Sequence, residues 1–146
     1  MIRSLLTAAT ILAAPVALAS DAALTVFKSP DCGCCGAWAE AMEAEGFAVR
    51  IVERDWSELD ALKAKLGIAP EHAGCHTAEI DGYVVEGHVP AADIRRLLDE
   101  RPGAIGIAVP GMPVGSPGME MGGQTEPYDV VLVTEPGEAV LFERHD

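Results

Sequence analysis

The stretch "AALTVFKSPDCGCCGAWAEAMEAEG" (residues 22–46) decides the fold, because an apolar run leads through a turn into a helical pattern. Residues 22–27 predict a short buried strand. The residues after the turn are rich in alanine and glutamate, with Trp38 and Met42 at helical spacing, and Gly46 fits a C-terminal cap. The sequence therefore predicts a strand followed by a helix, with three cysteines in the turn between them.

The rest of the chain continues this alternation. The patterns predict a strand over 47–52, a helix over 56–66 capped by Asp55, a hairpin of 76–80 and 83–87, and a helix over 89–100. This succession is typical of a thioredoxin-like α/β fold, in which helices flank a mixed sheet. Residues 102–123 hold seven glycines and four prolines and predict an irregular surface segment, and 128–143 predict a final strand pair.

Residues 1–19 have the pattern of a secretory signal peptide. Arg3 precedes an apolar run over 5–14, and Ala17-Leu18-Ala19 provides the small residues of a cleavage site. The apolar run is too short to span a bilayer. We expect export, cleavage before Ser20, and a single domain over 20–146 that has no membrane contact afterwards.

The charge of the chain restricts its partners. The formal net charge is −13, and removal of Arg3 with the leader makes the mature chain more acidic still. An acidic surface argues against nucleic acid and anionic membranes as partners and is compatible with attraction of cations.

The four cysteines admit more than one chemistry. Cys32 and Cys35 form a C-x-x-C motif in the position of a thiol–disulfide exchanger, which is one alternative. Cys34, inside that motif, could attack a mixed disulfide, and Cys75 would add a fourth thiol to a site that needs two. The predicted topology brings Cys75 beside the start of the first helix. An exchanger therefore explains two of the cysteines and leaves two unexplained.

Metal binding explains all four cysteines. Zinc accepts four cysteines, but its ligands usually come from two separated loops, and C-x-C-C bends poorly around one ion. Closely packed sulfurs are better suited to bridging several soft monovalent ions, and copper(I) prefers thiolate and thioether ligands. We interpret Cys32, Cys34, Cys35 and Cys75 as a copper–thiolate site.

Histidines and methionines supply further candidate ligands. Strand alternation should point His76 away from Cys75, toward solvent or a different side of the cluster, and His88 follows the hairpin. Either could ligate metal or be an ordinary hydrogen-bonded residue. Three methionines of the glycine- and proline-rich segment could donate thioethers to copper or simply cover a groove: Met112, Met119 and Met121.

Four stretches together resemble the CopG-type family of periplasmic copper-resistance proteins, which is also known as a domain of unknown function. They are "VFKSPDCGCCGAW", "GCHTAEIDGYVVEGHVP", "GIAVPGMPVGSPGME" and "EPYDVVLV", and the likeness runs from about Val26 to Val133. The resemblance implies a thioredoxin-like fold, periplasmic location, and a multinuclear copper site on the four cysteines.

The expected function is therefore copper(I) binding that contributes to copper resistance, with conversion between copper(I) and copper(II) as a redox activity. The expected partners are copper ions and other periplasmic copper-handling proteins. Two alternatives stay open: a thiol–disulfide oxidoreductase that uses Cys32 and Cys35, and a copper chaperone or storage protein without redox activity.

Overall fold

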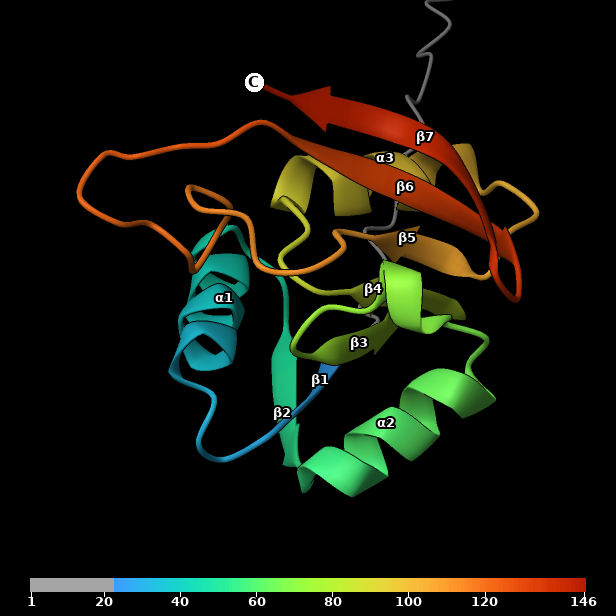
Figure 1. Cartoon of the computed structure of the whole chain (residues 1–146), viewed down its shortest axis with the longest axis horizontal. Coiled ribbons are helices and arrows are strands. Elements are labelled where there is room, and N and C mark those ends of the chain that lie inside the picture. Colours follow the sequence, from blue (N-terminus) through green and yellow to red (C-terminus); the bar gives the residue numbers. More distant parts are fainter. Residues whose placement is uncertain (1–22) are drawn as a thin grey trace, which may run out of the picture.

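The computed structural model describes residues 23–146, so the predicted signal peptide lies outside the described residues. The described residues form three α-helices and seven strands, whose arrangement Figure 1 shows. In order they are β1 (Leu24–Lys28), α1 (Gly33–Ala44), β2 (Val49–Glu53), α2 (Trp56–Lys65), a short 3-10 turn (Pro70–His72), β3 (Thr77–Ile80), β4 (Tyr83–Glu86), α3 (Ala91–Glu100), β5 (Gly106–Ala108), β6 (Tyr128–Glu135) and β7 (Glu138–His145).

All seven strands form one sheet in the order β2-β1-β3-β4-β5-β6-β7. The pairs β1–β2 and β4–β5 are parallel and the other pairs are antiparallel, so the sheet is mixed. This arrangement confirms the predicted α/β class, the helix-flanked mixed sheet and the final strand pair. Among the described residues, none of the helices combines the length and the apolar character that a membrane crossing requires.

The structure confirms two local predictions, the cap of α2 and the turn of the hairpin. Asp55 caps α2 by accepting a hydrogen bond from the Glu58 N–H at 2.8 Å, and the Glu58 side chain accepts one from the Asp55 N–H at 3.1 Å. This reciprocal pair is a capping box. Asp81 and Gly82 turn the β3–β4 hairpin with φ values of +49° and +86°, as a tight turn between twisted strands requires.

The segment between α3 and β6 is less irregular than predicted. Residues Gly106–Ala108 form β5, a three-residue strand that pairs with both β4 and β6. Gly106 permits this pairing because it has no side chain: a Cβ there would lie 1.8 Å from the Val84 carbonyl oxygen. A three-residue strand that begins with glycine, inside a segment rich in glycine and proline, carries little sequence signal, because its pairing is decided by the neighbouring strands.

The core lies between the sheet and the helices α1 and α3. Its buried side chains include Trp38 and Met42 from α1 and Ile94 and Leu97 from α3. Met42 is only 1% exposed and packs in the core on the same helix face as Trp38. Packing of α1 against the sheet fixes where its first turn lies, and that turn carries two of the cysteines.

Candidate metal centre

The cysteine turn joins the end of β1 to the start of α1. The Cys32 N–H donates to the Ser29 carbonyl at 3.1 Å, and Cys32 is the residue that precedes the first turn of the helix. The helix begins at Gly33, earlier than predicted, so Cys34 and Cys35 lie inside its first turn. Free backbone N–H groups and the positive end of the helix dipole meet there and favour anionic sulfur.

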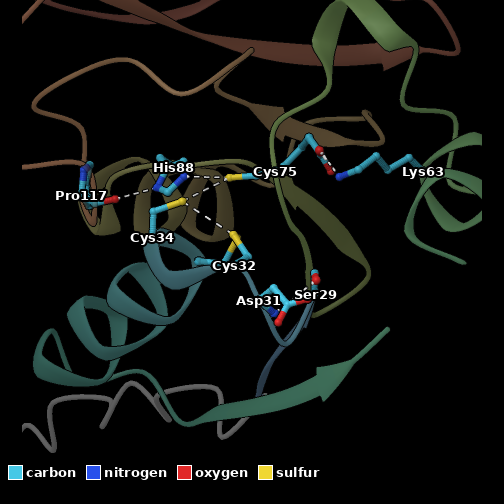
Figure 2. The surroundings of a disulfide bond; sticks show 10 residues. Ser29, Asp31, Cys32, Cys34, Lys63, Cys75, His88 and Pro117 are labelled. Carbon is cyan, nitrogen blue, oxygen red and sulfur yellow. Dashed lines mark hydrogen bonds and ion pairs between the residues drawn. A yellow bond between two sulfur atoms is a disulfide. The ribbon is translucent and has the colours of Figure 1, made fainter. Parts of the chain in front are cut away.

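Cys75 joins this turn from a distant part of the chain. The sequence predicts that Cys75 opens the third strand, but β3 begins at Thr77, so Cys75 lies in the bend that precedes the strand. Its Sγ is 3.6 Å from the Sγ of Cys34, which is in turn 3.6 Å from the Sγ of Cys32 (Figure 2). The sulfurs of Cys32, Cys34, Cys35 and Cys75 all lie within 4.8 Å of one another.

Two of the four cysteines are joined in the structure. Cys32 and Cys35 form a disulfide, while Cys34 is a half-buried thiol and Cys75 a buried one. The joined pair is the C-x-x-C motif of the sequence. The same four sulfurs can therefore exist as a disulfide with two thiols or, after reduction, as four thiols.

The Cys75 thiol lies in a buried environment. Burial, followed by the neighbouring Cys34, raises the pKa of Cys75 to about 12. At neutral pH and without metal, Cys75 is therefore protonated. A soft metal ion that binds here must displace this proton, because only the thiolate is a ligand.

His88 presents a ring nitrogen to the sulfurs. Its Nδ1 lies 2.9 Å from the Pro117 carbonyl oxygen and its Nε2 lies 3.2 Å from the Sγ of Cys75. Since a carbonyl only accepts, Nδ1 carries the proton and Nε2 keeps its lone pair. Burial lowers the pKa of His88, so the ring is neutral and Nε2 is free to accept from Cys75 or to ligate a metal ion.

His76 is fully buried on another side of the same group. Its ring lies 4.4 Å from that of Trp38 and 5.1 Å from that of His88, between centroids. The sequence allowed His76 to face either solvent or a different side of the cluster, and the expectation of solvent exposure is wrong. Neither ring nitrogen has a hydrogen-bond partner among residues 23–146, and burial lowers the pKa of His76 well below its usual value. Donor atoms of Cys75, His76 and His88 lie within 4.8 Å of one another, and could hold a metal.

The glycine- and proline-rich segment covers the start of α1. The φ of Gly118 is +81°, and a Cβ on this residue would lie 2.6 Å from the backbone nitrogen of Trp38 and 2.8 Å from the backbone oxygen of Cys34. Only glycine therefore lets the segment pack this closely against α1. The predicted thioether donors of this segment differ in exposure. Met112 is 52% and Met121 57% exposed, and Met119 is half-buried.

Comparisons with known proteins agree with this site. Residues 72–119, which include Cys75 and His88, match the family model "Protein of unknown function, DUF411". The solved structure "Copper resistance protein copG- Form 2" is 45% identical, with 86% of this chain and 98% of that chain covered and a TM-score of 0.78. The chain belongs to the CopG copper-resistance family. A second CopG structure, "Form 1", is 46% identical over 84% of this chain and 96% of that one, also at a TM-score of 0.78. Comparison with curated proteins finds no match.

Two features of this CopG-family site were not among the sequence predictions. The Pro117 carbonyl orients His88, and Lys63 and Glu86 form a buried ion pair close to Cys75. A backbone carbonyl leaves no sequence signal. Lys63, however, follows Leu59 by four positions and so falls on the buried face of α2, where a charged residue needs a partner.

Proposed function

We propose that this protein is exported to the periplasm, binds copper(I) through Cys32, Cys34, Cys35 and Cys75, and thereby contributes to copper resistance. The observation that carries the proposal is the convergence of these four sulfurs, from two distant segments, within 4.8 Å. It occurs in a chain 45% identical to a protein named for copper resistance. Residues 1–19 would direct export and then be removed, which leaves a single domain over 20–146.

The chemistry of the donors fits copper(I). Thiolates are soft ligands, and a monovalent ion allows several ions to balance several thiolates. The neutral Nε2 of His88 adds a nitrogen donor beside Cys75. Met119 is half-buried and follows Gly118, which packs against α1, so it is the first thioether candidate, with Met112 and Met121 as more exposed ones.

The position of the cysteines on α1 favours a multinuclear site. Cys34 and Cys35 are neighbours in a helical turn, where successive side chains point about 100° apart around the axis, as 3.6 residues per turn requires. Two such sulfurs converge poorly on one ion and bridge well between several. We therefore propose several copper(I) ions held together by bridging thiolates.

A redox role is part of the proposal. Copper(II) prefers imidazole nitrogen to soft sulfur, and His76 and His88 place such nitrogens next to Cys75. The protein would hold copper in either oxidation state by using the two kinds of donor. Other periplasmic copper-handling proteins would supply or receive the ions.

One observation favours a second candidate, a thiol–disulfide oxidoreductase. The Cys32–Cys35 disulfide lies at the N-terminus of a helix, where the electrostatics favour a reactive thiolate. Against this candidate stands Cys34, whose sulfur is 3.6 Å from that of Cys32 and would compete for any mixed disulfide. A copper chaperone without redox activity is a third candidate.

Metal analysis combined with thiol titration tests these proposals. Copper bound per chain is measured in Cys34→Ser and Cys75→Ser. If the four sulfurs form one site, both variants lose copper to a similar extent, although the residues are 41 positions apart. An oxidoreductase instead requires Cys32 and Cys35 and tolerates both serine variants. Full copper loading by Cys75→Ser would refute the single site. Expulsion of copper with disulfide formation on mild oxidation would refute the redox role and leave storage or delivery.

A further inference from the structure

A buried ion pair between Lys63 and Glu86 adjoins the segment that carries Cys75; Lys63 and Cys75 are labelled in Figure 2. Lys63 of α2 is 6% exposed, Glu86 at the end of β4 is 0% exposed, and Nζ lies 2.5 Å from Oε1. Buried ion pairs often stabilise a protein no more than apolar residues of similar volume would. The contacts of this pair point to a role beyond stability.

Both oxygens of the Glu86 carboxylate hold the chain on either side of Cys75. Oε1 accepts the Gly74 N–H at 2.8 Å, and Oε2 accepts the Thr77 hydroxyl at 2.6 Å. The Lys63 ammonium donates to Glu86 and also to the Thr77 oxygen at 2.9 Å. Residues 74 and 77 are thus fixed by one carboxylate, which is itself fixed by one ammonium group.

Gly74 is suited to this contact by its lack of a side chain. A Cβ on Gly74 would lie 2.5 Å from the Gly87 Cα, so the two backbones approach more closely than any other residue allows. The Gly87 N–H donates to the His76 carbonyl at 2.9 Å and holds the far side of the same bend. These contacts hold the backbone on both sides of Cys75.

We propose that Lys63 and Glu86 are positioning residues for Cys75: Glu86 holds the Gly74 N–H, Lys63 holds Glu86, and together they place the Cys75 sulfur beside Cys34. The pair acts through the backbone. That the positioned sulfur serves copper binding rests on the proposed function, whereas the positioning itself does not.

Two double variants separate the hydrogen bonds of Glu86 to the chain around Cys75 from the charge of the ion pair. In Lys63→Met/Glu86→Leu both charges are replaced together, which avoids leaving one charge buried alone, and the acceptor for Gly74 is lost. In Lys63→Met/Glu86→Gln the amide oxygen still accepts from Gly74 and the amide nitrogen donates to Thr77. The two variants differ in the side-chain hydrogen bonds to Gly74 and Thr77 and share the loss of the ion pair. Glu86→Asp is a third variant, which keeps the charges and withdraws the acceptor by one methylene.

The first readout needs no copper. In protein that keeps the Cys32–Cys35 disulfide, the oxidant diamide removes two electrons and two protons from Cys34 and Cys75 and joins their sulfurs, and mass spectrometry follows this bond. We expect the leucine double variant and Glu86→Asp to form it at least about tenfold more slowly than wild type, because misplaced groups react slowly. The glutamine double variant should stay within about twofold of wild type.

The second readout is copper(I) affinity, measured by competition with a chelator. Loss of the Glu86 contacts to Gly74 and Thr77 in the leucine variant should lower this affinity about tenfold, a typical effect of removing a group that orients a ligand. The glutamine variant should retain the affinity of wild type. Thermal unfolding establishes that the compared variants are folded. Equal cross-linking rates in the leucine and glutamine variants would overturn the positioning role. If wild type itself binds no copper, the proposed function fails, and the cross-linking rates still decide the positioning role.

Discussion

The burial of His76 predicts how the metal-free protein responds to mild acid. Its side chain is 0% exposed, it packs against Trp38 and His88, and burial holds its pKa well below the usual value. In the unfolded chain the same imidazole has a pKa of about 6.5. Below that pH the unfolded state binds a proton that the folded state does not, so stability falls as the pH falls.

The size of the effect follows from proton linkage. Between pH 7.5 and pH 5.5, an imidazole that stays neutral in the folded state lowers the free energy of unfolding by about 1.4 kcal/mol. Most carboxylates titrate below this window, so they contribute little to the change. The loss stops at lower pH, once the folded state also becomes protonated.

Chemical denaturation at the two pH values, with a copper chelator present, measures this change. The matched variant is His76→Leu, which replaces the imidazole by an apolar side chain of similar size. Wild type should lose about 1.4 kcal/mol more than the variant between pH 7.5 and 5.5, and the contribution of His88 cancels because both proteins contain it. Equal losses in the two proteins would show that His76 is not held neutral, and would refute the reasoning from burial.

Three other predictions concern the surroundings of the sulfurs. Gly118→Ala should destabilise the protein by about 1–3 kcal/mol in denaturation experiments, because its Cβ would strike α1, whereas Gly36→Ala, with no atom within 4 Å, should not. Reduction of the Cys32–Cys35 disulfide should raise the number of copper(I) ions bound per chain, since it frees two thiolates; an unchanged number would contradict this. Copper should slow proteolysis between residues 110 and 123 if a methionine there binds the metal, and equal rates would exclude this.

The fold could be predicted from local patterns because most elements carry their own signals. The Asp55 cap, the Asp81-Gly82 turn and the apolar spacing of α3 each specify an element without reference to distant residues. β5 could not be predicted in this way. Its three residues are ordered by strands on both sides, and Gly106 is there because the Val84 backbone lies too close for a side chain.

The sequence predicted that the four cysteines lie together, but not their bonding state or the position of the neighbouring His76. Three crowded cysteines and a later one pointed to convergence, which the distances around Cys34 confirm. The state of the cysteines and the position of His76 depend on packing that no local pattern encodes. His76 follows a bend rather than opening a strand, so its burial against Trp38 depends on how α1 lies over the sheet.

Cys34 distinguishes the two main functional candidates by its position between the other sulfurs. Its Sγ is 3.6 Å from the Sγ of Cys32 and equally far from that of Cys75. In an exchanger, a third thiol at this distance would attack mixed disulfides formed on Cys32 and release the wrong product. In a thiolate cluster the same short distances are what bridging between ions requires. One arrangement is thus a defect for exchange and a requirement for copper, and the geometry around Cys34 favours copper.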